Sequence, residues 1–340
     1  MSKGYLYTPG GSVSINTRDL APQVDNLTLK GGDGKIDATF SAVAPAYANL
    51  VKYYVVTANT HMPSGPNDGV SVMVLPGTGT LSCVLSGLEN GVIHHVRVFI
   101  RCTYGWQTSP MAYGVCTPLA IPALFADATW EQVDAASTGD IVPDTWNVGD
   151  EKVIILSTNE VLTLVILDFK HDDLADGSGK AGISIGLKNL MAETRRMNAS
   201  DTNRGGFTGS EMYSWMQNTL LMTLPSDLQA VLKTVNKKTS AGNQSSTINT
   251  NSMKLFLFSE VELFGSTHYS FAGEGSQYSI FTNNNSRIKY LANGTGAVVE
   301  WWGRSPYETN SRWFCDIMSN GVYGCRSSDS LYGVCFGFCV

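Results

Sequence analysis

The amino-acid sequence predicts two domains of different fold class, an all-β sandwich over residues 23–118 and an α+β domain over residues 129–340. The first observation behind this prediction is length, because 340 residues exceed the size of one small domain. The second is the pattern of apolar residues, which alternates in short runs in the first part and takes helical spacing behind capping residues in the second. We therefore expect a multidomain protein with one all-β and one mixed domain.

The N-terminal part divides into an arm and a set of short strands. Residues 1–22 are polar and rich in glycine without periodicity, and we expect them to form an N-terminal arm. From Leu27 onward apolar residues alternate with polar ones, first up to a turn at Gly31-Gly-Asp-Gly34 and then through Phe40. Further strands are expected at residues 53–56, 70–75, 81–85 and 92–102. About seven strands with a turn roughly every 8–12 residues are typical of a β-sandwich.

One stretch of the predicted sandwich matches a known family. The run Gly87-Leu-Glu-Asn-Gly91, followed by Val96-Arg-Val98, resembles the region of strands E and F in fibronectin type III domains. The match is partial, because His94 stands where that family usually has its corner Tyr and Phe40 stands where a Trp is common. The resemblance implies a sandwich of the fibronectin type III or immunoglobulin kind.

The chemistry of the chain changes after a stiff segment, Pro118-Leu-Ala-Ile-Pro122, and we expect a linker over residues 119–128. Thr129 and Gln132 have the spacing of a capping box, and the helix that they open is expected to end near Gly139. The other expected elements are a hairpin from residues 152–156 and 161–169, helices at 187–197 and after Thr208-x-x-Glu211 and Ser226-x-x-Gln229, a polar loop at 238–251 and a strand at 253–258.

The last forty residues, 301–340, combine an apolar framework with residues that share no chemical theme. The framework includes Trp301-Trp302, Phe314-Cys315 and Gly333-Val-Cys-Phe-Gly-Phe-Cys-Val340. Tyr and Trp supply rigid contact area and Ser, Gly and Asn supply adaptable hydrogen bonds, a mixture that is typical of binding surfaces. The predicted contact residues are Gly303, Tyr307, Thr309, Asn310, Arg312, Trp313, Asp316, Asn320, Tyr323, Arg326, Asp329, Leu331 and Tyr332.

The second domain also resembles an uncharacterised domain family of phages and gut bacteria. The matching stretches are Trp130-Glu-Gln132, Trp146-Asn-Val-Gly-Asp-Glu151, the run from His171 to Gly179, Gly209-Ser-Glu-Met212, Leu224-Pro-Ser-Asp-Leu228, the run from Met253 to Phe264, and residues 301–340. The pairing of Trp301-Trp-x-Arg-Ser-Pro306 with Gly333-Val-x-Phe-Gly-Phe338 is similar to the variable proteins of diversity-generating retroelements. That resemblance implies a C-type-lectin-like fold of the formylglycine-generating-enzyme type, with a variable segment at residues 301–340.

The resemblance implies that variable positions are rewritten at the adenines of Asn codons. Changing the first two bases of AAC can yield Tyr, Asp, Gly, Thr, Arg, Ser, Leu, Val or Cys but never Trp, Met, Glu, Lys or Gln. The predicted contact residues fall in the accessible set except Trp313, and Glu308 and Met318 nearby also fall outside it. We expect those three residues to be invariant if the scheme applies.

Composition limits the partners and the compartment. A net charge of −6 without a cluster of Lys and Arg argues against nucleic acid as a partner. No apolar run approaches the roughly 18 residues that span a bilayer, and the first residues lack the apolar core of a secretion signal. Seven cysteines, an odd number, favour synthesis in a reducing bacterial cytoplasm. We therefore expect no membrane insertion and a virion protein, part of a phage tail, that is released by lysis.

Two groups of residues could hold a metal ion. Cys335 and Cys339 approach the close pairing that structural zinc prefers, although buried free thiols explain the late cysteines better. Asp172, Asp173 and Asp176 on a Gly-rich loop could hold calcium, with an Asx-turn loop as the alternative. We expect no cofactor, with calcium as the remaining candidate.

The sequence favours binding over catalysis. No His, Lys or carboxylate is placed to activate Cys335 or Cys339, and no hydrolase, metalloprotease or P-loop motif is present. The residues and the resemblance together predict a phage or prophage receptor-binding or tail-associated protein that recognises a protein or glycan of the host-cell surface. We expect a homo-oligomer, with a trimer as one arrangement, and contacts with other tail proteins. The alternative is a structural baseplate or decoration protein without a ligand site.

Overall fold

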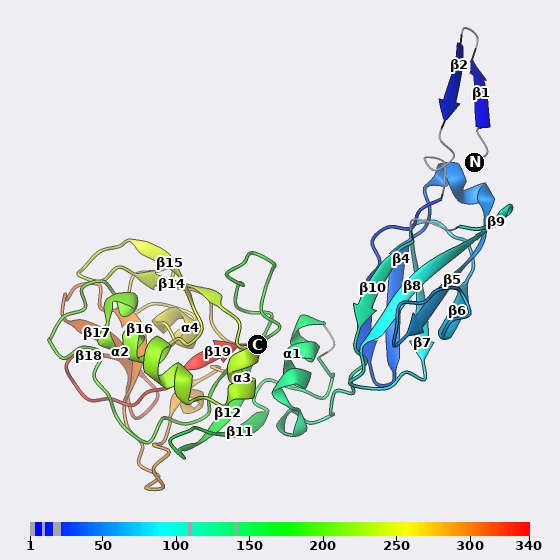
Figure 1. The fold of residues 1–340 in the computed structure, drawn as a ribbon. Helices are drawn as coiled ribbons and strands as arrows, with labels where there is room; N and C mark the ends of the chain where they lie inside the picture. Colours follow the sequence, from blue (N-terminus) through cyan, green and yellow to red (C-terminus); the bar gives the residue numbers. More distant parts are fainter. Residues whose placement is uncertain (1–3, 9–10, 16–21, 108–110, 140–141) are drawn as a thin grey trace. The chain divides into compact units, whose positions relative to one another are not determined.

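The computed structural model describes residues 4–8, 11–15, 22–107, 111–139 and 142–340. The chain divides into two compact units, Met1–Ile121 and Pro122–Val340 (Figure 1). The secondary structure is mostly β, arranged in several separate sheets with few helices. No helix within the described ranges is long and apolar enough to cross a membrane.

Besides the hairpin of β1 (Gly4–Thr8) and β2 (Gly11–Ile15), the described part of the first unit contains two larger antiparallel sheets. One has the order β3-β4-β7, and the other has the order β10-β8-β5-β6 with β9 paired to β8. The strands are β3 (Thr28–Gly32), β4 (Lys35–Ser41), β5 (Val51–Asn59), β6 (Val70–Val74), β7 (Thr80–Ser86), β8 (His94–Cys102), β9 (Gly105–Trp106) and β10 (Tyr113–Cys116), with a 3-10 helix η1 (Pro45–Leu50). This arrangement confirms the prediction of an all-β sandwich at the level of architecture.

The core of the first unit lies between its sheets and is apolar. Ile36, Ala38 and Phe40 alternate inward along β4 and pack in one cluster with residues of β5 and β8. The Phe40 and Tyr54 rings meet edge to face with 5.3 Å between centroids. The Tyr54 hydroxyl accepts a hydrogen bond from the Val43 backbone N–H at 3.2 Å, so its buried polar atom has a partner.

Two predicted boundaries differ from the structure. Within the expected arm at 1–22, β1 (Gly4–Thr8) and β2 (Gly11–Ile15) pair as an antiparallel hairpin, and the remainder up to residue 21 lies outside the described residues. The expected linker at 119–128 is divided between the units after Ile121. Phe125 in the 3-10 helix η2 (Phe125–Asp127) is buried against Trp146 with 5.3 Å between ring centroids, which makes its segment part of the second core.

The second unit combines three sheets with short helices, and the strand β19 lies in its interior (Figure 1). Its strands are β11 (Glu151–Ile155), β12 (Val161–Phe169), β13 (Ile183–Leu187) and β19 (Gly337–Cys339) in one sheet, β14 (Val235–Ser240) and β15 (Ile248–Met253) in a hairpin, and β16 (Trp301–Pro306), β17 (Trp313–Ile317) and β18 (Tyr323–Ser327) in the third sheet. Its helices are α1 (Trp130–Thr138), η3 (Phe207–Gly209), α2 (Glu211–Trp215), the π-helix η4 (Met216–Leu220), η5 (Leu221–Thr223), α3 (Ser226–Val231), α4 (Glu260–Phe264) and η6 (Asn284–Arg287).

Several element predictions in this unit hold. The capping box at Thr129 and Gln132 is formed, and α1 is followed by Gly139 as its C-cap. The hairpin expected from residues 152–156 and 161–169 is the pair β11 and β12. In these places the local residue pattern and the tertiary fold agree.

Other element predictions are wrong. The helix expected at 187–197 is absent, because Leu187 ends β13 and an irregular loop follows. Ser210, and not Thr208, caps α2 by accepting a hydrogen bond from the Tyr213 N–H at 3.1 Å. Ser226 lies inside α3, whose N-cap is Pro225.

The predictions of a polar loop at 238–251 and a strand at 253–258 are both wrong. The polar residues 238–251 form most of the hairpin β14–β15, whereas the apolar run after Met253 has no regular strand partner and makes only a bridge from Phe256 to Gly337. Burial explains the difference, because Leu255, Phe256, Leu257 and Phe258 are all fully inside.

A network of buried charges crosses the core of the second unit. Lys237 donates hydrogen bonds to Asp172 and to the Tyr278 hydroxyl, at 2.6 and 2.9 Å, and forms an ion pair with Glu262 at 2.6 Å. Glu262 is in turn held by both terminal nitrogens of Arg304, one of them at 2.9 Å. All five residues are buried, so the network stabilises the unit only as a complete set of partners.

The charges of this network are reinforced by their neighbours. Burial raises the pKa of the Asp172 carboxyl, but the charge of Lys237 and hydrogen bonds from His171, Lys237 and Ser184 hold that pKa well below its usual range. Burial likewise opposes ionisation of Glu262, yet Arg304 and Lys237 lower its pKa. Both carboxylates are therefore ionised at neutral pH inside the folded unit.

Candidate functional site

The three-stranded sheet of β16, β17 and β18 carries most of the predicted contact residues, and its register divides them. Trp313 pairs with Ser327, and Phe314 pairs with Arg326. Paired residues of antiparallel strands project to the same side, and successive residues alternate. Trp313 and Tyr323 therefore belong to one side of the sheet, and Arg326 belongs to the other.

On the first side, aromatic rings form a continuous contact series. Tyr307 stacks with Trp313 at 6.0 Å between centroids and meets Tyr269 edge to face at 5.4 Å. Tyr269 continues the series to Tyr323 at 5.7 Å, and Tyr323 stacks on His268 at 3.6 Å. We call these five residues, His268, Tyr269, Tyr307, Trp313 and Tyr323, the aromatic surface; each of them is at least partly exposed.

Two members of the aromatic surface were missed by sequence reasoning. His268 and Tyr269 lie in the loop that follows α4, outside the C-terminal segment. A His-Tyr pair in a stretch rich in Gly and Ser was the available signal, but nothing in its local pattern connects it with residue 307 or 323. The backbone hydrogen bond from the Glu308 N–H to the Tyr269 carbonyl, at 2.9 Å, joins the two loops in space.

A buried carboxylate fixes the first loop of the aromatic surface. Glu260 accepts hydrogen bonds from the Tyr269 and Ser270 backbone N–H groups at 3.1 and 2.9 Å, and from the Ser270 hydroxyl at 2.8 Å. Its own backbone N–H donates to the Ser305 hydroxyl at 2.9 Å. The loop conformation is thus set by the buried side chains of Glu260, Ser270 and Ser305.

A buried amide fixes the second loop. The Asn203 side chain donates hydrogen bonds to the carbonyls of Asn310 and Trp313 at 2.7 and 2.8 Å, and its oxygen accepts from the Asn243 N–H at 2.8 Å. Gln244 donates to the Thr309 carbonyl at 2.9 Å. These contacts reach the backbone of residues 309–313, so exchanging a side chain in this loop leaves them in place.

On the other side of the sheet, Arg326 and Tyr332 form a smaller polar group. The Arg326 guanidinium donates to the Tyr332 hydroxyl at 3.1 Å and lies 3.6 Å from the Glu300 carboxylate. Tyr332 packs edge to face on the buried Trp302 with 5.0 Å between centroids. The structure therefore brings Arg326 and Tyr332 together. Arg326 lies on the opposite side of the sheet from Trp313 and Tyr323 of the aromatic surface.

The remaining exposed contact residues lie on loops. Arg312 is 3.4 Å from Asp201, and Asp329 accepts a hydrogen bond from the Ser327 hydroxyl at 2.6 Å. The others are Thr309 and Asn310 before β17, Asn320 in the turn between β17 and β18, and Leu331 after β18.

Two predicted contact residues are buried, and the prediction that they lie on the surface is wrong. A Cβ atom on Gly303 would lie 3.2 Å from the Cys315 carbonyl oxygen and 3.3 Å from that of Phe258, so close strand packing leaves little space for a side chain. Asp316 lies inside, and neither carboxylate oxygen has a hydrogen-bond partner among the described residues. Burial raises the pKa of Asp316 to about 7, against the lowering effect of Arg326.

The three candidate calcium ligands face different partners. Asp172 belongs to the buried network, Asp173 pairs with Lys180 at 3.0 Å, and Asp176 accepts hydrogen bonds from Ser178 in an Asx-turn arrangement. Among the described residues, no group of three or more His, Cys, Asp or Glu side chains is placed to hold a metal ion.

The cysteines are free thiols, and Cys335 and Cys339 are fully buried. Burial raises the pKa of both thiols, so both are protonated at neutral pH. The structure therefore places these two residues in the core, where the Cys335 thiol donates to the Leu187 carbonyl at 3.5 Å and the Cys339 thiol donates to Asp172 of the buried network at 3.3 Å.

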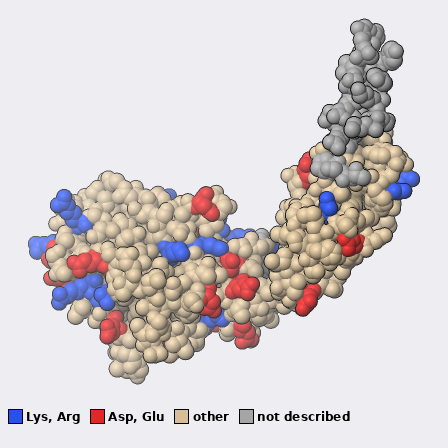
Figure 2. Space-filling model, viewed as in Figure 1, with Lys and Arg blue, Asp and Glu red and all other residues tan. Residues whose placement is uncertain are grey.

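Charged side chains are sparse on the surface. The face shown in Figure 2 is mostly uncharged, with Lys, Arg, Asp and Glu scattered over it and no continuous basic area in view.

Comparison with known proteins finds one matching family model, whose function is unknown, and a solved structure of low similarity. A model described as a domain of unknown function, DUF6273, matches residues 181–340, which contain the aromatic surface and the sheet of β16, β17 and β18. A solved β-sandwich protein obtained by computer-based redesign is similar at 16% sequence identity and a TM-score of 0.23, over 29% of this chain and 97% of that chain. No curated protein matches the chain.

Proposed function

We propose that this protein is a phage or prophage receptor-binding or tail-associated protein that binds a ligand of the host surface through the aromatic surface. The observation that carries the proposal is the unbroken series of rings from Trp313 to His268, partly exposed and held by buried side chains. Exposed Tyr and Trp side chains on a rigid support are the residues that dominate binding interfaces. The assignment to a phage tail rests on the sequence resemblance alone.

The supports of the aromatic surface suit a segment whose side chains can change. Glu260 and Asn203 bind backbone atoms of the two loops, and both lie outside residues 301–340. Exchanging Tyr307 or Tyr323 would therefore alter the contact chemistry while the loop conformation persists. Within this proposal Gly303 and Asp316 belong to the scaffold, and diversification acts on the exposed positions.

Further parts of the proposal follow from the resemblances. We take the first unit as a fibronectin type III-like module and the second as a C-type-lectin-like domain that carries the ligand-binding surface. A homo-oligomer would present several copies of this surface, and simultaneous binding would strengthen an individually weak contact.

The test replaces Tyr307, Trp313 and Tyr323 together with Ala in the full chain. Binding to intact cells of gut-bacterial isolates, measured by flow cytometry, is expected to fall at least about tenfold, because truncation of interface aromatics typically costs more than about 1.4 kcal/mol. The matched control is Tyr290→Ala, which removes an exposed aromatic ring outside the aromatic surface.

The melting temperature of the triple variant separates binding from folding. Unchanged cell binding of a folded triple variant would contradict the proposal and favour the structural baseplate or decoration role. Equal loss in the Tyr290→Ala control would show that the effect is not specific to the aromatic surface, which also contradicts it.

A further inference from the structure

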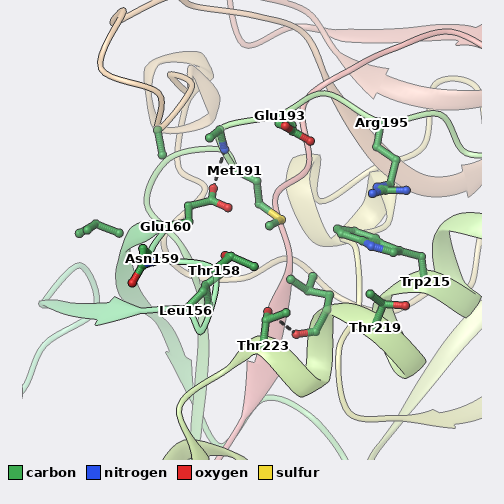
Figure 3. Close-up of a pocket in the computed structure, with 14 residues that line it drawn as sticks. Leu156, Thr158, Asn159, Glu160, Met191, Glu193, Arg195, Trp215, Thr219 and Thr223 are labelled. Carbon is green, nitrogen blue, oxygen red and sulfur yellow. Dashed lines mark hydrogen bonds between the residues drawn. The ribbon is translucent and has the colours of Figure 1, made fainter.

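A second candidate site lies in the second unit, apart from the aromatic surface. A cavity of about 640 Å³ opens between the turn that joins β11 to β12, the loop after β13, and the helical run of α2, η4 and η5 (Figure 3). Its volume falls in the range of small-molecule sites, roughly 300–1,000 Å³. None of the residues that line it belongs to the segment 301–340.

The inner part of the cavity is apolar. Leu156, Met191 and Leu220 line it, and each is buried in the unit. Leu220 ends the π-helix η4, and helices of this kind occur frequently at functional sites. A ligand group without polar atoms would be accommodated there by burial of apolar area.

Around this apolar part stand polar groups that have no hydrogen-bond partner among the described residues. The side chains of Thr158, Glu193 and Thr219 and the indole N–H of Trp215 line the cavity, and none makes a hydrogen bond with another of the described residues. In Figure 3 the Trp215 ring and the Glu193 carboxylate border the same open space. They offer donors and acceptors to a ligand at no cost in broken internal hydrogen bonds.

Two charged side chains on opposite walls are held in place. The Glu160 carboxylate accepts a hydrogen bond from the Ala192 N–H at 2.6 Å through one oxygen, and within the described part of the chain the other oxygen has no hydrogen-bond partner. The Arg195 guanidinium lies 3.9 Å over the Trp215 ring. The Arg195 backbone is hydrogen-bonded to Tyr332 and accepts from the Trp302 indole at 2.7 Å, which anchors this wall to the core.

The charge pattern selects the class of ligand. Glu160 and Glu193 disfavour an anion, and the Arg195 guanidinium balances one of the two carboxylates, so a cation gains less here than it would beside two unbalanced carboxylates. A neutral ligand with many hydroxyl groups can donate to the carboxylates and accept from the guanidinium and the indole. Its C–H groups can cover the apolar residues.

We propose that this cavity binds a neutral saccharide, either a free sugar or a sugar unit of a larger glycan. The site is independent of the proposed aromatic surface, since the two share no residue. It would remain constant while the C-terminal segment changes. The second unit would then carry two separate sites, a sugar site of constant sequence and an aromatic surface whose side chains vary.

The test titrates the full chain with glucose, galactose, mannose and N-acetylglucosamine, observed by saturation-transfer NMR, with lysine and acetate as charged probes. We expect at least one neutral sugar to bind with a dissociation constant of about 0.1–10 mM, and neither charged probe to compete. A matching oligosaccharide that binds at least about tenfold more tightly than its monosaccharide would indicate a glycan as the source, and equal affinity would indicate the free sugar.

Variants locate the site. Trp215→Ala and, as a change that preserves volume, Thr219→Val are each expected to weaken sugar binding, the first by about tenfold or more. The triple variant of Tyr307, Trp313 and Tyr323 is expected to bind sugar unchanged, so failure of the aromatic surface and failure of the cavity give different results.

Three results would overturn the proposal. They are the absence of binding by all four sugars, stronger binding of lysine or acetate than of any sugar, and sugar binding that survives both cavity variants in proteins that melt normally.

Discussion

The two units are stabilised by cores of different chemistry. The core of the first unit is a cluster of apolar side chains from two sheets, whose central strands β4, β5 and β8 are paired on both sides. The core of the second unit contains Lys237, Glu262 and Arg304 in fully buried contact. The difference shows that in a loop-rich unit many buried backbone N–H and C=O groups need hydrogen-bond partners other than a neighbouring strand.

In the second unit, buried charged and polar side chains serve as those partners. Arg304 donates to the carbonyls of Leu257 and Glu274 at 2.9 and 2.8 Å, and Lys289 donates to those of Leu187 and Lys188, both at 2.8 Å. Unpaired backbone groups inside a protein cost free energy comparable to a lost hydrogen bond. The side chains thus make irregular backbone tolerable in the interior, including the loops below the aromatic surface.

The largest expected effect comes from breaking the network. Glu262→Ala leaves Arg304 and Lys237 buried without their shared carboxylate, and we expect the free energy of unfolding of the second unit to fall by about 3–5 kcal/mol. Differential scanning calorimetry of the full chain should show the transition of the second unit at lower temperature and that of the first unit unchanged. A loss below about 1 kcal/mol would mean that the network is not essential to this core.

A smaller effect, with a distinct pH dependence, is expected at Asp316. Its pKa is about 7 in the folded unit and roughly 3.9 in an unfolded chain, so the folded state binds the proton more tightly. This stabilising contribution is complete below about pH 4 and is lost as the pH rises through 7.

The melting temperature of the second unit should therefore rise as the pH falls from 8 to 5. Asp316→Asn should flatten this dependence and stabilise the unit at pH 8 by about 1–3 kcal/mol. The control is Asp329→Asn, an exposed carboxylate on the same segment, which should keep the wild-type slope. A wild-type slope in Asp316→Asn would show that the buried carboxylate does not titrate in this range.

The smallest effect is expected in the apolar core of the first unit. Ile36→Val removes one buried methylene and should cost about 0.5–1.5 kcal/mol, without dependence on pH between 5 and 8, because no charge loses a partner. Differential scanning calorimetry of the full chain, read at the transition of the first unit, measures this effect. A cost as large as that of Glu262→Ala would remove the contrast between the two cores.

Local patterns predicted the elements whose partners are near in sequence. Alternation around Phe40 predicted β4, and the capping box at Thr129 predicted α1, since both signals act over a few residues. The run from Leu255 to Phe258 misled the same reasoning, because an apolar strand and an apolar irregular segment have equal composition.

The candidate site was predicted in part for the same reason. Tyr307, Trp313 and Tyr323 were recognisable as aromatic residues on a loop-rich segment, but their grouping depended on strand register. A shift by one residue would exchange the sides of the sheet, and composition does not encode that choice. Tyr269 is held in the aromatic surface by the Glu260 carboxylate and by the hydrogen bond from the Glu308 N–H. The second of these contacts joins residues far apart in the sequence, which a local pattern cannot predict.

By itself the sequence determined the all-β and mixed character of the two parts, the capped helix α1, and the presence of aromatic residues in the last forty positions. These features follow from side-chain periodicity and from short-range hydrogen bonds. Only the tertiary structure decided that Gly303 and Asp316 lie inside, that His268 and Tyr269 complete the aromatic surface, and that a cavity opens beside Trp215. The reason is physical, since burial and charge pairing are settled by contacts between residues far apart in the chain.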